Sequence, residues 1–313
     1  MERPIRLRRS VLSVPANRDK MVRKALSLPS DVVMLDLEDS VPVGEKESAR
    51  LRVTEALRDG QWGDRVRALR INGMDTPFAY HDIIDVVEAA GGYLDVLVIP
   101  KVSDASEVKA VDYLLTQIEM RMGFRRSIGL EASIETAAGM LRVEEIAFSS
   151  QRLEALVFGV ADYAASVSMM SKGVSGHGDA EDFYPGHRWH FPLSRMVMAA
   201  KAAGLAATDA PFGDYRNVEG LRRSCVWSAA LGCDGKWAIH PDQLPTINEV
   251  YTPSEEDVQR AECILKAYRE ARAAGHGSLS IDGKMVDAAS IRIAKLIHGQ
   301  SEAIRRRSTS EDA

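Results

Sequence analysis

Residues 127–159, SIGLEASIETAAGMLRVEEIAFSSQRLEALVFG, hold two short apolar runs separated by a helical pattern. The runs at residues 127–132 and 155–159 have the length of buried strands, and residues 137–147 between them repeat apolar side chains at helical spacing. The order strand, helix, strand predicts a βαβ unit, in which both strands lie parallel in one sheet. We therefore expect a parallel sheet covered by helices.

The same alternation continues in both directions along the chain. Six more apolar runs bring the predicted strands to eight: residues 9–14, 32–37, 66–71, 94–99, 206–210 and 235–239. Helical patterns lie between them, among others at residues 19–27, 46–58, 105–122, 193–203 and 219–231. Eight such units in about 240 residues match a TIM (β/α)8 barrel. An open doubly wound sheet, which usually has fewer strands, is the alternative.

Two regions do not fit the regular barrel. Residues 171–190, in the long sixth connection, are rich in Gly and His and have little periodicity, which is typical of a functional or disordered loop. Beyond the eighth strand, helical patterns at residues 254–274 and 288–297 have no place in the barrel core. We expect a barrel domain over residues 1–250, a C-terminal helical extension acting as a lid over 251–300, and a polar tail over 301–313.

Composition narrows the class of protein. The chain has 313 residues and a net charge of −5, which argues against nucleic-acid or membrane-surface partners, since both favour a broad basic face. Its three cysteines form no CxxC pair and fit no disulfide framework, so a reducing compartment is expected. The N-terminus lacks the apolar core of a signal peptide, and no apolar run approaches the roughly 20 residues of a membrane span. A cytoplasmic location follows.

Polar side chains stand at the predicted carboxyl ends of most strands, where barrel enzymes place their chemistry. In chain order they are Asp36, Glu38, Asp39, Arg70, Asn72, Lys101, Glu135, Asp162, Asp209, Asp214 and His240. Any one of them alone is more often a helix cap or a surface ion pair. Because the ends of all eight strands meet at one mouth, the whole set predicts an active site.

Glu135 and Asp162 follow neighbouring strands and are candidate metal ligands. Two hard oxygen ligands, completed by waters, suit Mg²⁺. The alternative is that each carboxylate caps the helix that starts just after it. From position alone the two interpretations have equal weight.

Cationic residues suggest where anions bind. Arg70 offers a planar partner for a carboxylate or a developing oxyanion, or alternatively an ion pair with Asp36 or Glu38. Arg18 directly precedes the first predicted helix and Lys24 lies on it, and the start of this helix is a candidate anion site. A solvated basic face is the alternative for that helix.

Several of these segments also resemble one known family, over about residues 9–298. The matching motifs are LDLEDSV at 35–41 with Lys46 following, RING at 70–73, IPKV at 99–102, IETA at 134–137, FGVAD at 158–162, DAPFGD at 209–214, GKWAIHP at 235–241 and GKMVDAA at 283–289. Together they resemble the HpcH/HpaI aldolase and citrate lyase β-subunit family, in its malyl-CoA lyase branch. That family has a TIM-barrel fold.

The resemblance implies roles for individual residues. Glu135 and Asp162 would bind Mg²⁺, with Mn²⁺ as a substitute, and Arg70 would contact the small oxo acid. Asp287 would be the catalytic acid/base, supplied by the C-terminal extension of a neighbouring subunit, which requires a homo-oligomer such as a trimer or hexamer. The other implied site residues are Arg18 and Lys24 at the phosphates of coenzyme A, Ala161 and Asp162 at the glyoxylate carboxylate, Ile239 and His240 in the substrate or CoA site, and Asp36, Glu38, Asp39, Lys46 and Lys101 in support.

The expected function is a Mg²⁺-dependent acyl-CoA lyase. It would reversibly cleave L-malyl-CoA, or β-methylmalyl-CoA, to glyoxylate and acetyl-CoA, or propionyl-CoA. Ser13 and Ala210 depart from the family pattern, so a citramalyl-CoA lyase and a malyl-CoA thioesterase are alternatives. A non-catalytic subunit that binds acyl-CoA or an acyl carrier in a larger complex is the alternative from another class.

Overall fold

The computed structural model describes residues 6–170, 188–273, 279–281 and 284–311. The chain divides into two compact units, Met1–Tyr251 and Thr252–Ala313, each of which is described by itself. The loop expected at residues 171–190 lies outside the described part of the chain except for its last three residues. No helix among the described residues is long and apolar enough to cross a membrane.

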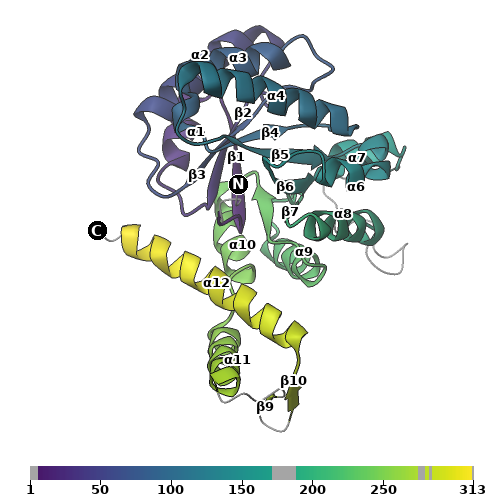
Figure 1. Cartoon of the computed structure of the whole chain (residues 1–313). Helices are drawn as coiled ribbons and strands as arrows, with labels where there is room; N and C mark the ends of the chain where they lie inside the picture. Colours follow the sequence, from purple (N-terminus) through teal and green to yellow (C-terminus); the bar gives the residue numbers. More distant parts are fainter. Residues whose placement is uncertain (1–5, 171–187, 274–278, 282–283, 312–313) are drawn as a thin grey trace. The chain divides into compact units, whose positions relative to one another are not determined.

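The first unit is a closed barrel of eight parallel strands (Figure 1). The strands are β1 (Ser10–Pro15), β2 (Val32–Asp36), β3 (Val66–Arg70), β4 (Val96–Ile99), β5 (Gly129–Ile134), β6 (Leu153–Phe158), β7 (Ala206–Asp209) and β8 (Gly235–Ala238). Each pairs with the next, and β1 pairs with β8 to close the ring. The predicted TIM barrel is confirmed, and the open sheet is wrong.

Helices follow the strands and surround the barrel (Figure 1). They are α1 (Asp19–Ala25), α2 (Lys46–Asp59), α3 (Ala79–Ala90), α4 (Ala105–Met122), α5 (Ala137–Leu141), α6 (Val143–Ala147), α7 (Val160–Ser166), α8 (His190–Ala202), α9 (Val218–Ala230) and α10 (Leu244–Val250). The helix predicted at residues 137–147 is two short helices, because the backbone of Arg142 leaves the helical region at φ −115° and ψ 18°. Helices α3, α7 and α10 are additional to those singled out from the sequence.

Side chains of the strands pack on both faces of the barrel wall. Those that point outward, such as Leu35 and Leu97, pack against the helices, while Met34, Val98 and Trp237 belong to a separate cluster inside the barrel. Burial on both faces explains why the strands are continuous apolar runs and not alternating ones. Polar side chains are therefore concentrated at the two ends of the barrel.

The C-terminal unit is a helical hairpin with a small antiparallel ribbon. It consists of α11 (Glu255–Ala273), β9 (Leu279–Ile281), β10 (Lys284–Val286) and α12 (Ala288–Glu311), with β9 paired to β10 and α11 packed on α12. Helix α12 continues to Glu311, through residues that we expected to form a polar tail. Ion pairs from Arg305 to Glu302, one turn earlier, and to Glu262 of α11 support this extension.

Candidate active site

The polar residues expected at one mouth do gather at the carboxyl ends of β2 to β6. Asp36 and Arg70 are the last residues of β2 and β3, Lys101 stands two residues after β4, Glu135 follows β5 directly, and Asp162 lies in α7 after β6. The register of the barrel makes Asp36 and Arg70 direct cross-strand neighbours. Parallel pairing thus brings together residues that are more than 100 positions apart in the sequence.

Arg70 is held rigidly at this mouth. Its Nε and Nη2 donate to the two oxygens of Asp36, each at 2.7 Å, and its Nη1 lies 3.0 Å from Glu38 Oε2. The guanidinium also lies 5.4 Å from the ring centroid of Trp237. Burial by itself would raise the pKa of Asp36, but Arg70 lowers it below its ordinary value. Arg70 therefore makes the ion pairs considered from the sequence, and Asp36 occupies its bidentate edge.

Lys101 connects carboxylates from several strand ends. Its Nζ lies 2.6 Å from Glu38 Oε1, 3.2 Å from Asp39 and 3.8 Å from Asp162 Oδ1, while its backbone N–H donates to Glu135 Oε1 at 2.6 Å. Burial by itself would lower the pKa of Lys101, but its hydrogen bond to Glu38 and the surrounding carboxylates raise it above the ordinary value. The side chain is therefore a permanent cation among acids.

Glu135 is buried and electrostatically unfavourable in its charged form. Burial and the charge of Glu38 raise its pKa to about 7, with a further contribution from Asp162. Arg70 and the backbone N–H of Lys101 oppose this rise without cancelling it. A carboxylate in such a position would gain a favourable partner from an additional cation.

The helix-cap alternative for these two acids is wrong. Helix α5 is capped by Thr136, whose hydroxyl accepts from the Gly139 N–H at 2.9 Å, so Glu135 is not its cap. Helix α7 begins after Gly159, which has no capping side chain, and Asp162 lies within its first turn. Both carboxylates are thus available to the mouth of the barrel.

Gly159 makes the position of Glu135 feasible. A Cβ atom at residue 159 would lie 2.2 Å from Glu135 Oε2 and 2.3 Å from Glu135 Cβ, far inside van der Waals contact. A glycine is therefore required where β6 ends beside β5. Sequence reasoning did not single out this residue, although a glycine directly after an apolar strand is a recognisable signal of close approach. Trp237, which faces Arg70, was missed because its apolar ring reads as core.

The balance of charge at the mouth fits a divalent cation. The carboxylates are Asp36, Glu38, Asp39, Glu135 and Asp162, and Arg70 and Lys101 form ion pairs with four of them. The third cation, Lys46, donates from its Nζ to the backbone carbonyls of Leu37 and Glu38 and interacts electrostatically with the acids at the end of β2. Acids outnumber bases by two. Among the described residues, no three His, Cys, Asp or Glu side chains converge as a complete ligand set. Two carboxylates with remaining positions for water and substrate are the pattern of Mg²⁺ sites.

The remaining predicted residues lie at other points. Arg18 and Lys24 are exposed on α1, and Ala161 is exposed on α7. Ile239 and His240 follow β8, where the Gln243 side chain accepts hydrogen bonds from both of their backbone N–H groups, at 2.8 and 3.2 Å.

Asp287 belongs to the C-terminal unit and is exposed there. Its carboxylate accepts a hydrogen bond from the Ser290 N–H at 2.7 Å at the start of α12, and this bond lowers its pKa. Asp287 thus belongs to the C-terminal unit, whereas the residues of the barrel mouth belong to the first unit.

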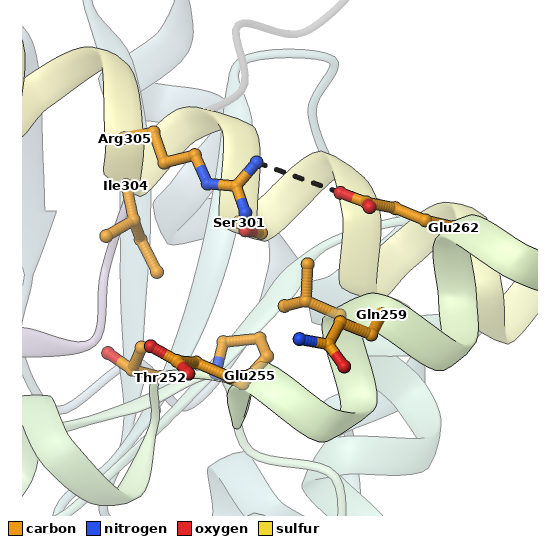
Figure 2. Close-up of a pocket in the computed structure, with 9 residues that line it drawn as sticks. Thr252, Glu255, Gln259, Glu262, Ser301, Ile304 and Arg305 are labelled. Carbon is orange, nitrogen blue, oxygen red and sulfur yellow. Dashed lines mark ion pairs between the residues drawn. The ribbon is translucent and has the colours of Figure 1, made fainter.

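Two cavities have linings that include none of the residues of the barrel mouth. One of about 310 Å³ in the C-terminal unit lies between α11 and α12, where Figure 2 shows Arg305 reaching toward Glu262 at 3.7 Å. Another of about 300 Å³ is lined by residues of α1 and α2. Neither is lined by any of the residues that we predicted for the site.

The closed barrel and the ionised side chains gathered at the carboxyl ends of its strands have the architecture of an α/β-barrel enzyme. A family model described as HpcH/HpaI aldolase/citrate lyase matches residues 9–241. The chain is 43% identical to an L-malyl-CoA/beta-methylmalyl-CoA lyase of Cereibacter sphaeroides, with 96% of each chain covered. It belongs to the HpcH/HpaI aldolase/citrate lyase family, as its sequence motifs predicted, and so to a family of carbon–carbon lyases.

Two further relatives bear on the site. A malyl-CoA/beta-methylmalyl-CoA/citramalyl-CoA lyase of Chloroflexus aurantiacus is 35% identical, with 95% of this chain and 88% of the relative covered. The crystal structure of protein CitE from Mycobacterium tuberculosis, in complex with magnesium, acetoacetate and coenzyme A, superimposes with a TM-score of 0.72 at 26% identity. That match covers 94% of this chain and 97% of the other.

Proposed function

We propose that this chain is a magnesium-dependent acyl-CoA lyase that reversibly cleaves L-malyl-CoA, or β-methylmalyl-CoA, to glyoxylate and acetyl-CoA, or propionyl-CoA. The observation that carries the proposal is the excess of carboxylates at the barrel mouth, centred on Glu135 and Asp162, in a chain 43% identical to a lyase of that name. The metal-bound and CoA-bound relative supports the choice of ion and thioester. Mn²⁺ is a substitute of similar ligand preference.

Glu135 and Asp162 would hold the ion, and Gly159 leaves the space that Glu135 needs. A magnesium ion bound there supplies Lewis-acid polarisation of the hydroxyl and carboxylate oxygens of the malyl group. The backbone at Ala161 and Asp162, in the first turn of α7, would receive the carboxylate of the oxo acid.

Arg70 would stabilise negative charge as the bond between the carbinol carbon and the neighbouring methylene breaks. The hydroxyl would release its proton to solvent, its carbon would become the aldehyde of glyoxylate, and the electron pair of the broken bond would pass to the thioester as an enolate. Asp287 would take up a proton from solvent before it acts on this enolate. Because Asp36, Glu38 and Trp237 already fix Arg70, it needs little reorganisation when this charge develops.

Asp287 would donate the proton that converts this enolate into the methyl group of acetyl-CoA. It lies at the start of α12 in the C-terminal unit, and we propose that it serves the barrel of a neighbouring subunit in a trimer or hexamer, with the unit acting as a lid. Arg18 and Lys24 on α1 would meet the phosphates of CoA, and Ile239 and His240 would line the thioester site. Mixing the separately inactive Glu135→Gln and Asp287→Asn proteins tests the exchange, because mixed oligomers should regain activity.

A product assay tests the reaction itself. Purified protein is incubated with malyl-CoA, β-methylmalyl-CoA and citramalyl-CoA, with and without Mg²⁺, and glyoxylate, pyruvate and free thiol are measured separately. We expect glyoxylate without release of free CoA thiol, and no product after removal of the metal. Free thiol with malate would indicate a thioesterase, and pyruvate from citramalyl-CoA would extend the activity toward that of the Chloroflexus aurantiacus relative. Absence of any product would favour a non-catalytic acyl-CoA-binding subunit.

A further inference from the structure

Lys101 is in contact with both proposed metal ligands through two different groups. Its backbone N–H donates to Glu135 Oε1 at 2.6 Å, and its Nζ lies 3.8 Å from Asp162 Oδ1. The same Nζ also lies 2.6 Å from Glu38 Oε1 and 3.2 Å from Asp39 Oδ2. The ammonium thus stands among acids that come from the ends of β2 and β6.

The backbone of Lys101 is held in an unusual conformation to make these contacts. Its φ is +52°, in the left-handed region that residues with a Cβ adopt only at a cost in free energy. Ser168, also at positive φ, is the other such non-glycine residue in the described part of the chain. A turn of this shape directs the N–H toward Glu135 and the side chain toward Asp162.

The contacts of the ammonium are graded in length. The bond to the buried Glu38 is short, at 2.6 Å, whereas the contact to Asp162 is the longest, at 3.8 Å, and the side chain of Asp162 is 41% exposed. Asp162 is therefore the carboxylate that Lys101 can release with the smallest loss. A divalent cation between Glu135 and Asp162 would take over the neutralisation of Asp162 and would repel the ammonium.

We propose that Lys101 is the resident counter-ion of the metal site: it neutralises Asp162 and positions Glu135 while the site is free of metal, and it lowers Mg²⁺ affinity by competing for Asp162. This inference rests on the proposed function, since it takes Glu135 and Asp162 as the metal ligands. It assigns Lys101 a positioning role and a direct influence on metal affinity.

When the charge of Lys101 is removed, the proposal and a merely structural role predict opposite changes in Mg²⁺ affinity. If Lys101 only supported the fold of the mouth, its loss would weaken Mg²⁺ binding. If it is a counter-ion, removal of its charge leaves the carboxylates more negative and without a competitor, so Mg²⁺ binds more tightly. The metal-free protein becomes less stable at the same time, because the acids repel each other without compensation.

The experiment measures Tm of the metal-stripped full-length protein as MgCl2 is titrated, since a ligand that binds the folded state raises Tm with its concentration. The variants are Lys101→Met, which removes the charge, and Lys101→Arg, which keeps it. Lys101→Gly also removes the charge, but glycine adopts a positive φ without strain, so this variant keeps the backbone N–H directed toward Glu135. It serves as the second uncharged variant in case Lys101→Met does not fold. Glu135→Gln and Asp162→Asn define the site.

We expect Lys101→Met and Lys101→Gly to lower Tm without metal and to shift the Mg²⁺ midpoint to on the order of ten-fold lower concentration, given the strength of a charge interaction at about 4 Å. Lys101→Arg should stay close to the wild-type midpoint. An unchanged or higher midpoint in both uncharged variants overturns the inference, while loss of binding in Glu135→Gln and Asp162→Asn leaves the proposed metal site standing. If those two variants bind Mg²⁺ as the wild type does, the metal assignment fails, and the inference fails with it.

Discussion

The two ends of the barrel both carry buried carboxylates, but they neutralise them differently. At the floor, where the strands begin, Arg8 pairs with Glu131 at 2.8 Å and with Glu154, which also meets Arg6 at 3.1 Å. Arg9 likewise pairs with Asp31, and Arg67 with Asp95, each at 2.8 Å. At the mouth, five carboxylates share three cations, and the pKa of Glu135 is raised to about 7.

The same packing device is used at both ends. A Cβ at Gly129 of β5 would lie 2.2 Å from Glu154 Oε1, just as a Cβ at Gly159 would lie 2.2 Å from Glu135 Oε2. In each case a glycine makes room for a glutamate of the neighbouring strand. At the floor this room admits a carboxylate that arginines neutralise, whereas at the mouth it admits one that stays electrostatically unsatisfied. Equal geometry thus accompanies a neutralised carboxylate at one end and a carboxylate with a raised pKa at the other.

The largest expected effect comes from neutralising the mouth. Glu135→Gln keeps an acceptor for the Lys101 N–H but removes a ligand charge, so we expect kcat/KM to fall on the order of 10³-fold. The metal-free variant should nevertheless be as stable as the wild type at pH 8, or more so, because an unfavourable buried charge is gone. Steady-state kinetics and thermal unfolding check both parts. If Glu135→Gln lost activity and stability together, the mouth would not differ from the floor in what its carboxylates contribute.

The matched substitution at the floor, Arg8→Met, should lower stability and leave activity nearly unchanged. Arg8→Met leaves Glu131 and Glu154 buried without their shared partner, which should cost about 4 kcal/mol of unfolding free energy, as is typical of a broken buried ion pair. Activity per folded molecule should stay near the wild-type value. Arg8→Lys, which keeps the charge, is the control and should lose less. Urea unfolding measures the loss of stability, and steady-state kinetics on the folded fraction measure activity. A large fall in kcat for Arg8→Met would contradict the prediction that the floor serves stability alone.

A smaller effect is expected in the pH dependence of the unfolding free energy of the metal-free protein. The folded pKa of Glu135 lies above its ordinary value of 4.5, at about 7, so between these two pH values the folded state binds more protons than the unfolded state. The contribution of Glu135 to the unfolding free energy is therefore fully present below pH 4.5. It decreases by about 3 kcal/mol in total as the pH rises through about 7.

Glu135→Gln is the control for that pH dependence. The difference in unfolding free energy between wild type and variant, measured by urea unfolding from pH 4.5 to 8, isolates the contribution of this carboxyl. Contributions of groups that do not interact with Glu135 cancel in the difference, so what remains comes from this carboxyl and the acids coupled to it, Glu38 and Asp162. A difference that does not vary with pH would mean that the burial of Glu135 leaves its titration unchanged.

The smallest expected effect concerns Trp237, whose ring faces Arg70 at 5.4 Å. Trp237→Leu removes the cation–π contact and should lower kcat/KM about five-fold, for an interaction of about 1 kcal/mol. Trp237→Phe keeps an aromatic face and should retain most of the activity. If both variants behave alike, the ring fills space and does not orient Arg70.

Local sequence predicted the fold well because its signals are local. Buried parallel strands are continuous apolar runs, and the predicted bounds of all eight lie within two residues of the observed ones. The sequence predicted one helix over residues 137–147 where the structure has two, because the apolar spacing continues across Arg142. Only the backbone angles of Arg142 show the break. The end of α12 was missed because its support comes from Glu262 on another helix.

For the site, the sequence by itself determined which residues stand at the strand ends, because a strand run and its next polar residue are adjacent in the chain. It also determined family membership through eight ordered motifs. It left open whether Glu135 and Asp162 are helix caps or face the mouth, and whether Arg70 is free or paired.

Only the tertiary structure decided those questions, because burial and charge depend on groups that are distant in sequence. Closure of the barrel places Lys101, two residues after β4, against acids at the ends of β2, β5 and β6, and it raises the pKa of Glu135 through burial and the charge of Glu38. It also turns Gly159 from an ordinary loop glycine into the space that admits Glu135. The sequence names the charged groups, and three-dimensional proximity sets their energies.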